Sequence, residues 1–308
     1  GSTRNQIINL PVDQSSGFNT AMTNVGKVEN KGIEVQFKAT PIQKNNGLKW
    51  DVNINWAANR NKVVDVSSAL GAEKRLTLYG AWSNTYLVAE EGKPLGQLYG
   101  IAFKRSPDGQ QIFNNGLPVY TDTVQNFGNT NPDFTASMKN SFSWRGVTAS
   151  FMLDAKVGGN MMSHSHAQLS SSGKLKNTLP GRETGIIGQG VVENPDGTYS
   201  PNTVRVPAAL YYNQYYHSAV LEPHVFSATY MKLREVSIGY KLPKKFIKWH
   251  AIKSANITLT GRDLLVFTRF PLFDPETATL NSAQVLPGIE IGQFPSTRSF
   301  GASLNLEF

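Results

Sequence analysis

Apolar and polar residues alternate along several stretches of the chain. In the segment 33–40, Ile33, Val35 and Phe37 are separated by charged or amide side chains, and the segment 50–56 repeats this period of two. Because successive side chains of a β-strand point to opposite faces, each stretch predicts a strand with one apolar and one polar face. We expect the apolar face to carry Val35, Phe37, Trp50, Val52, Ile54 and Trp56, and the polar face to carry Glu34, Gln36, Lys38, Asp51, Asn53 and Asn55.

Ten strands are predicted in this way, each boundary being good to a few residues. They cover 2–10, 26–41, 49–60, 76–88, 96–104, 134–144, 147–160, 225–241, 255–268 and 298–308. The connections alternate strictly between long and short. The long ones are 11–25, 61–75, 105–133, 161–224 and 269–297, and the short ones are 42–48, 89–95, 145–146 and 242–254.

This alternation of connection lengths distinguishes between two folds. A soluble β-sandwich also alternates apolar and polar residues, so the strand pattern alone fits both a sandwich and a membrane barrel. An outer-membrane barrel has short turns at one rim and long loops at the other, which favours the barrel. The predicted fold is an all-β, transmembrane antiparallel β-barrel with its apolar side chains towards lipid and its polar side chains towards the lumen. The last strand ends on Phe308, which we predict to act as the C-terminal barrel-assembly signal.

Composition narrows the function classes. No run of eighteen apolar residues exists, which excludes a transmembrane helix, whereas a barrel strand needs only every second residue to be apolar. The formal charge of +8 comes from scattered Lys and Arg residues, so we predict contact with lipid and lipopolysaccharide phosphates and no nucleic-acid binding. The absence of cysteine excludes disulfides and thiolate metal sites.

Several motifs occur in a recognisable order. They are N-K-G-I-E at 30–34, W-D-V-N-I-N-W-A-A-N-R-N-K-V at 50–63, G-K-P-L-G-Q-L-Y-G at 92–100, V-G-G-N at 157–160, Y-M-K-L-R-E-V-S-I-G-Y-K-L-P at 230–243, G-R-D-L-L-V-F-T at 261–268 and D-P-E at 274–276. In this order the chain resembles the C-terminal part of the SusC/RagA-type TonB-linked (TonB-dependent) outer-membrane transporters.

The resemblance implies a 22-stranded, plugged barrel, of which residues 1–308 supply about ten C-terminal strands. The remaining strands and the plug would lie on the same precursor or on a separate chain. The implied function is active import of oligosaccharides or peptides, energised by the TonB complex, beneath a SusD-like surface lipoprotein. The implied location is the outer membrane of a Gram-negative, Bacteroidota-like bacterium, as a multi-pass protein without catalysis or cofactor. Two alternatives stay open: a non-transporting scaffold or accessory barrel subunit, and a small barrel closed by these ten strands alone.

The long connection 161–224 holds the strongest candidate for recognition. Its stretch 210–217 combines flat apolar rings with hydroxyl and amide groups, which suit a sugar, a peptide or a protein partner. We predict substrate binding or lid contact there, with packing inside the loop as the alternative. The residues are Tyr211, Tyr212, Asn213, Gln214, Tyr215 and Tyr216.

Candidate metal and acid–base residues are few. His164 and His166 would share one face of a strand, but no cysteine or acidic cluster accompanies them, so we predict loop histidines and no metal site. His224 is isolated in the sequence. The carboxylates Asp274 and Glu276 lack a nucleophile motif, so we expect them to cap a turn in the last outer loop rather than to catalyse.

Overall fold

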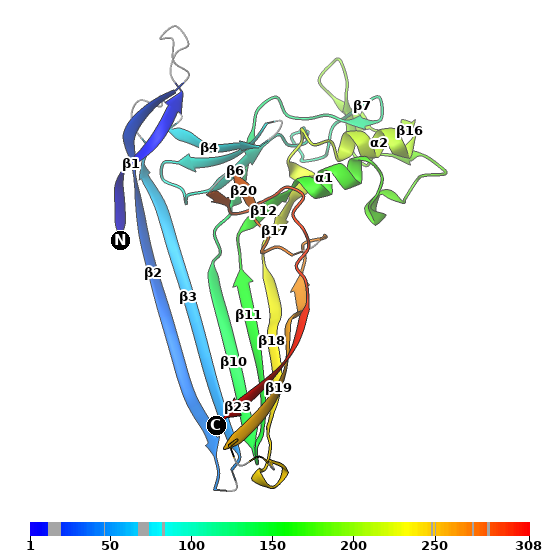
Figure 1. Ribbon diagram of the computed structural model, residues 1–308. Helices are drawn as coiled ribbons and strands as arrows, with labels where there is room; N and C mark the ends of the chain where they lie inside the picture. The colour runs from blue at the N-terminus through cyan, green and yellow to red at the C-terminus, as the bar shows by residue number, and fades with distance from the viewer. Residues whose placement is uncertain are drawn as a thin grey trace.

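The computed structural model describes the 308-residue chain except for residues 12–19, 46, 67–73, 82–83, 248, 250, 273 and 282–283. Its largest element is an eight-stranded antiparallel sheet, here called the wall, in the order β1-β2-β3-β10-β11-β18-β19-β23. The long strands lie side by side, and the wall is open, with β1 and β23 at its two edges (Figure 1). The wall strands are β1 (Ser2–Pro11), β2 (Thr20–Gln43), β3 (Lys49–Asp65), β10 (Phe134–Trp144), β11 (Val147–Val157), β18 (Tyr230–Lys241), β19 (Ser254–Thr268) and β23 (Ser299–Glu307).

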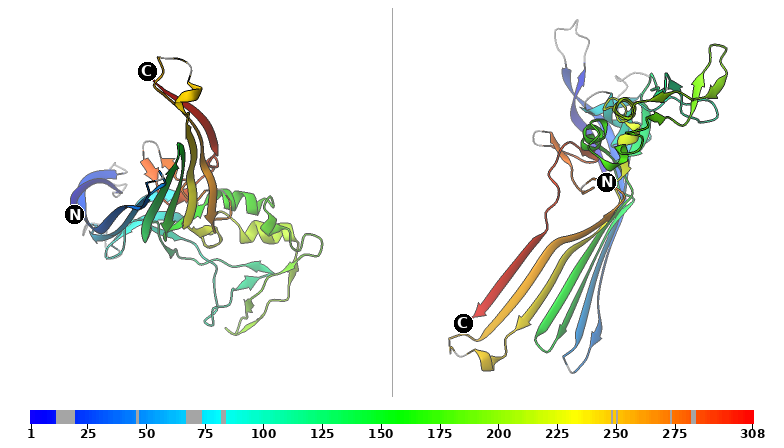
Figure 2. Two further views of the ribbon diagram at one scale, coloured as in Figure 1. Left: turned by 90° about the horizontal axis from the view of Figure 1, so that it is seen from below. Right: turned by 90° about the vertical axis from the view of Figure 1, so that its right-hand side faces the viewer.

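The long connections gather at one end of the wall and the short turns at the other. Residues 66–133, 158–229 and 269–298 form what we call the loop layer, and Figure 2 shows it at the opposite end from the turns and the C-terminus. The loop layer contains β4 (Arg75–Ala81), β5 (Thr85–Glu90), β6 (Gln97–Gly100), β7 (Phe113–Asn114), β8 (Leu117–Pro118), β9 (Gln125–Asn129), β12 (Asn160–Ser163), β13 (Ile186–Ile187), β14 (Val191–Glu193), β15 (Tyr199–Pro201), β16 (Arg205–Val206), β17 (Val225–Ser227), β20 (Thr279–Asn281), β21 (Gln284–Leu286) and β22 (Ile289–Glu290). Its helices are α1 (His164–Ser171) and α2 (Ala208–Tyr215), with 3-10 turns η3 (Lys176–Thr178) and η4 (Glu222–His224), and a third 3-10 turn, η5 (Lys244–Phe246), lies in the turn between β18 and β19.

Two of the ten predicted wall strands were assigned wrongly. The segments 76–88 and 96–104 become β4, β5 and β6, which join β9 in a separate four-stranded sheet of the loop layer. All four residues of β6 are buried, so this strand is covered on both faces like a strand in a protein interior. Among the described residues the wall therefore has eight strands with β1 and β23 as its edges, so the ten predicted strands do not form a small closed barrel there.

Two other predicted strands are divided in the structure. Residues 225–241 split into β17 and β18, and residues 147–160 split into β11 and the start of β12. In each case the short piece leaves the wall, because β12 and β17 pair with each other and β12 pairs with β22. The alternation of connection lengths survives these corrections, since 44–48, 145–146 and 242–253 are the short turns. The connection between β1 and β2 lies outside the described residues.

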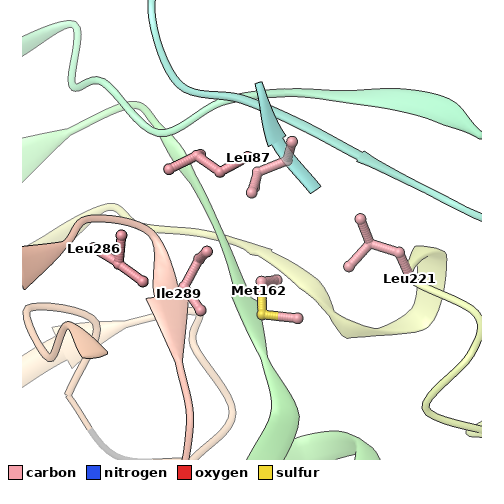
Figure 3. Close-up of a cluster of buried hydrophobic side chains, with 6 residues drawn as sticks. Leu87, Met162, Leu221, Leu286 and Ile289 are labelled. Carbon is pink, nitrogen blue, oxygen red and sulfur yellow. The ribbon is translucent and has the colours of Figure 1, made fainter. Parts of the chain in front are cut away.

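The buried core lies in the loop layer. One cluster combines side chains from all three long connections, and Figure 3 shows five of its members facing one another. A Cβ added at Gly100 would come within 2.4 Å of the Leu221 Cβ, so only glycine allows β6 to approach η4 this closely. In a second hydrophobic cluster, Val28 of β2 and Val63 of β3 pack against buried side chains of the loop layer. The members of the first cluster are Leu87, Leu98, Met162, Leu221, Leu286 and Ile289.

Candidate functional site

One face of the wall carries a continuous row of polar side chains. The Gln36 Nε2 donates to the Asn55 Oδ1 at 3.0 Å, and the Asn55 Nδ2 donates to the Ser137 Oγ at 3.2 Å. Lower on the same face, the Thr40 hydroxyl donates to Asp51 at 2.6 Å and the Lys49 ammonium lies 2.8 Å from Asp51. The register places the other predicted lumen-facing residues, Glu34, Lys38 and Asn53, on this polar face.

The opposite face presents apolar side chains to the surroundings. Val35 is 51% exposed and Phe37 is 53% exposed, and their neighbours across the sheet are Trp56 and Ile54. A wide apolar surface of this kind marks a contact with lipid or protein, because leaving it in water costs about 25 cal/mol per Å². Trp50 and Val52 lie on the same face. The assignment of this face to lipid and of the polar face to a lumen stays a prediction, as does the assembly role of the exposed Phe308.

The Trp50 indole shows how a polar atom is accommodated on the apolar face. Its Nε1 donates to the Asn140 Oδ1 at 3.0 Å, and its ring stacks on Phe142 with 5.8 Å between ring centroids. Asn140 is buried, so its amide is shielded from the apolar surroundings. The aromatic pair lies close to the short turns, where interfacial rings are expected in a membrane barrel.

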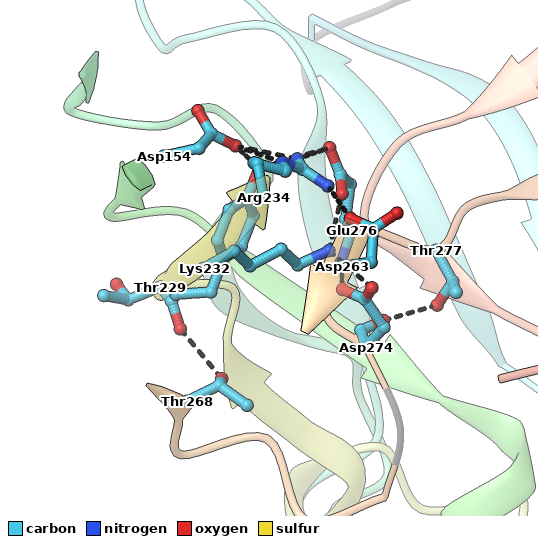
Figure 4. A network of polar contacts seen from close by, with 10 residues as sticks. Asp154, Thr229, Lys232, Arg234, Asp263, Thr268, Asp274, Glu276 and Thr277 are labelled. Atoms are coloured by element: carbon cyan, nitrogen blue, oxygen red, sulfur yellow. Dashed lines mark hydrogen bonds and ion pairs between the residues drawn. The ribbon is translucent and has the colours of Figure 1, made fainter. Parts of the chain in front are cut away.

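A network of ion pairs joins the polar face of β18 to the last outer connection (Figure 4). Lys232 and Asp274 are each 3% exposed and form an ion pair, and the Lys232 Nζ also lies 2.6 Å from Glu276. Arg234 binds Asp154 at 2.7 Å and also contacts Glu276. We call this network of Lys232, Arg234, Asp154, Asp263, Asp274 and Glu276 the clasp, because it holds residues 274–276 against the wall.

The backbone of β18 makes this arrangement possible. The pairing of β18 with β11 shifts between Leu233 and Glu235, which is a β-bulge with Arg234 as the extra residue, and the register with β19 shifts at the same place. Burial alone would raise the pKa of Glu276, but hydrogen bonds from Arg234 and Lys232 and their charges outweigh it and bring this pKa down to about 2. Glu276 is therefore ionised at neutral pH, as its ion pairs with Arg234 and Lys232 require.

The predicted turn capping at D-P-E is confirmed. The Glu276 backbone N–H donates to the Asp274 Oδ1 at 2.9 Å, and the Thr277 hydroxyl donates to the Asp274 carbonyl at 2.8 Å. The ion pairs to β18 were not predicted, because their partners lie 42 residues or more away in the sequence. The local sequence, two carboxylates flanking a proline in a turn, does not indicate that these carboxylates pair with basic residues of a distant strand.

The tyrosine-rich stretch is a helix rather than an irregular loop. Four rings stack along α2 and its end, with centroid distances of 5.6 Å for Tyr211–Tyr215 and 6.0 Å for Tyr212–Tyr216. The Tyr212 hydroxyl donates to the Pro180 carbonyl at 3.0 Å, and the Tyr120 hydroxyl donates to the Gln214 carbonyl. Burial raises the pKa of Tyr211 to about 12. The rings therefore act as packing elements of the loop layer in their neutral form.

The exposed side of α2 remains available for contacts. Asn213 is exposed, and Leu210 is half exposed. Both residues line a cavity of about 730 Å³ between α2 and the end of α1, together with Arg182 and Ser171. Substrate binding or lid contact by residues 211–216 stays a prediction, and these surface positions are where it would take place.

The structure brings together two histidines that the sequence separates by 58 residues. His166 lies in α1 and His224 in η4, both side chains are buried, and their Nδ1 atoms are 3.0 Å apart. The interpretation of His166 as a loop histidine and of His224 as isolated was therefore wrong, because His166 lies in a helix and contacts His224. His164 begins α1 and lies close to Gln168. Within the described ranges, no three His, Cys, Asp or Glu residues are placed to hold a metal ion. No helix in the same ranges has the length and apolar character needed to span a bilayer.

Comparison with known proteins identifies relatives along the whole chain. No family model matches it. The chain is 23% identical over 330 residues to TonB-dependent receptor P3 of Formosa agariphila, covering 99% of this chain and 31% of the receptor. It is 24% identical over 365 residues to TonB-dependent receptor P39 of the same organism, covering 100% of this chain and 33% of the receptor.

Solved structures show the same fold. The chain aligns over its full length with 32% of a chain in the structure of the RagAB peptide transporter, with a TM-score of 0.70 and 20% identity. The RagAB peptide importer in its open-open state gives a TM-score of 0.68 at 18% identity, again over 32% of that chain. The chain thus spans about a third of the relatives that it matches, all of which are named as receptors, transporters or importers. It is a homologue of the TonB-dependent receptors with the β-barrel wall fold of a SusC/RagA-type transporter.

Proposed function

We propose that this chain forms part of the wall and outer loops of an active outer-membrane importer for oligosaccharides or peptides. The observation that carries the proposal is the division of the wall into an exposed apolar face and a hydrogen-bonded polar face, with every described long connection at one rim. Lipid outside and a water-filled or plugged lumen inside satisfy both faces at once. The peptide transporters among its structural neighbours support the peptide class of substrate.

The open edges of the wall require further strands. Unpaired backbone groups of β1 and β23 would be costly in lipid, so other strands must pair with both edges. A 22-stranded barrel with eight strands from this chain needs about fourteen more, and a plug to fill its lumen. We propose that these parts lie on the same precursor or on a separate chain, with the TonB complex acting on the plug. In this arrangement the chain crosses the outer membrane several times, surrounded by lipid and lipopolysaccharide.

The loop layer is the natural contact for a SusD-like lipoprotein. Apolar side chains at its outer end are exposed, among them Leu179, Ile187, Val204 and Leu210. Charges introduced at Val204 and Leu210 should reduce co-purification of the lipoprotein, because desolvating a new carboxylate opposes binding. The matched control is Gln189→Glu, at an exposed polar position of the same layer. Equal co-purification of all variants would place the lid contact elsewhere.

Transport itself is tested in cells. A strain lacking the gene for the complete protein that carries this chain should fail to accumulate a labelled oligosaccharide or peptide, and a strain lacking TonB should show the same defect. Restored uptake with the wild-type gene completes the test. The scaffold alternative predicts the opposite result, in which uptake is unchanged while a larger envelope complex dissociates.

A further inference from the structure

The rim formed by the short turns is strongly basic. In residues 44–51, 141–148, 241–254 and 305–308, the described positions include seven basic side chains and two acidic ones, Asp51 and Glu307. Asp51 already pairs with a lysine at 2.8 Å, and Glu307 accepts a hydrogen bond from Ser254 at 2.7 Å. The seven basic residues, here called the basic rim, are Lys44, Lys49, Arg145, Lys241, Lys244, Lys245 and Lys253.

Contacts between the turns make the basic rim continuous. Gly47 lies against the backbone of Arg145, and the Lys241 N–H donates to the Gly146 carbonyl at 2.8 Å. The Lys253 N–H in turn donates to the Glu307 carbonyl at 2.6 Å, which joins the third turn to the last strand. The turn between β18 and β19 is the largest of the three, and Figure 1 shows it at the end of the wall opposite the loop layer. Positive charge therefore runs across most of the lower edge of the wall.

Exposed aromatic rings stand among these charges. Phe246 is 62% exposed and Trp249 is 71% exposed in the turn between β18 and β19. The Lys245 Nζ lies 5.1 Å from the centroid of the Phe246 ring, and the Arg145 guanidinium lies 5.1 Å from the Trp144 ring. Large rings left in water beside lysines are unfavourable in a purely aqueous setting, whereas the boundary between headgroups and acyl chains suits both.

The rings continue the apolar face of the wall. Trp144 pairs with Val147, and Val147 pairs with Tyr240, so one exposed row crosses three strands immediately above the turns. A soluble acidic protein would neutralise the lysines but would have no reason to follow this apolar row. A phospholipid meets both features, since its phosphate reaches the basic rim while its acyl chains lie along the row.

We propose that the basic rim binds anionic phospholipid headgroups of the leaflet that faces the short turns, with Lys244 and Lys245 contacting phosphates and Phe246 and Trp249 lying among the glycerol and upper acyl groups. This inference rests on the proposed membrane function. It adds a lipid selectivity that the wall alone does not require, because apolar faces accept charged and neutral lipids equally. Lys244 and Lys245 are the members of the basic rim best suited to bind lipid phosphates, since no carboxylate among the described residues pairs with either of them.

The experiment uses the complete protein that carries this chain, in nanodiscs of phosphatidylethanolamine with increasing phosphatidylglycerol. Lipid retained after transfer to mild detergent is counted by native mass spectrometry. The wild type should retain phosphatidylglycerol in preference to phosphatidylethanolamine, and Lys244→Glu with Lys245→Glu should reduce this preference roughly tenfold. The control, Lys174→Glu with Lys176→Glu, makes the same charge change at exposed positions of the loop layer and should leave the preference unchanged.

A neutral version, Lys244→Gln with Lys245→Gln, keeps the test valid if charge reversal prevents assembly. Equal phosphatidylglycerol retention by the wild type and by the rim variants that assemble overturns the inference. So does the discovery that the rim variants lose a bound acidic protein while their lipid content stays the same. Uptake separates the two levels of the argument: an active transporter without lipid preference refutes the lipid site alone, whereas a protein that never enters the membrane refutes the proposed function.

Discussion

The buried pair His166 and His224 makes the loop layer sensitive to acid. The Asn177 Nδ2 and the Ser170 hydroxyl each lie 3.3 Å from the His166 Nε2, and both can donate to it, which favours the His166 proton on Nδ1. That proton then points to the His224 Nδ1 at 3.0 Å, which must accept it. Both imidazoles are neutral in this arrangement, and two charged rings are excluded because their Nδ1 protons would meet.

The pKa values give the direction of the effect. Burial lowers the pKa of His166 to about 4. Burial and then the neighbouring His166 lower the pKa of His224 to about 3, although carbonyls of His217 and Tyr216 oppose this shift. The nearby His164 also has a lowered pKa because of burial. A group whose folded pKa is depressed stabilises the fold above its unfolded value of about 6.5, and this stability is lost as the pH falls towards the folded value.

The magnitude follows from the linkage relation. At pH 5, about 1.5 units below the unfolded pKa, each histidine that is protonated only in the open state removes about 2 kcal/mol of stability. The pair together removes about 4 kcal/mol, which is roughly a thousandfold increase in opening of residues 158–229. Because α1 and η4 meet at this pair, opening should separate these two elements first.

Amide hydrogen exchange at pH 7.5 and pH 5.0, corrected for intrinsic rates, measures this opening. We expect protection of peptides from α1 and η4 to fall at pH 5.0, and His224→Gln to halve the dependence on pH. His217→Gln is the matched control, since His217 is exposed and near in sequence. Equal pH dependence in the wild type and in His224→Gln would refute the reasoning.

Three further predictions concern the wall and its contacts with the loop layer. Val35→Arg should cost roughly 2–4 kcal/mol and lower the outer-membrane yield, whereas Gln36→Arg should not, and equal yields of the two by quantitative blotting would contradict the assignment of faces. Asp274→Ala should free residues 269–298, since removing one partner of a buried ion pair costs roughly 3–5 kcal/mol; unchanged hydrogen exchange in that segment would show that the clasp is dispensable. Gly100→Ala should destabilise the loop layer by roughly 1–3 kcal/mol, because its methyl group would overlap Leu221, and an unchanged midpoint of thermal unfolding in detergent would mean that the helical turn shifts freely.

The period of two predicted the wall well because strands such as β2 and β3 have one apolar and one polar face. The segments around Val35 and Trp50 carry this contrast in every second residue, and the structure pairs them in the same wall. The wrong assignment of 96–104 to the wall arose because this segment lacks such a contrast between its two faces. Residues 97–100 are buried on both faces, so their apolar character shows a strand but not which sheet the strand joins.

The contacts of the candidate site could not be read from the sequence. His166 and His224 are brought together only when β12 and β17 pair, and Lys232 meets Asp274 only when the last connection folds back onto β18. The residues next to each of these side chains in the sequence do not indicate which distant residue it will contact. The tyrosine stretch was missed as a helix because Tyr211 to Tyr216 gives a short, weakly periodic segment whose shape is set by packing on Phe103 and Tyr120.

The shared core of the three long connections has a mechanical consequence. Leu98 belongs to the first connection, Met162 to the second and Ile289 to the third, and all three side chains lie in one closely packed cluster. Packed interiors resist deformation, so a displacement of one connection is passed to the other two. A lid resting on any part of this layer would therefore move it as a single body, and through the clasp that movement would reach the strands below.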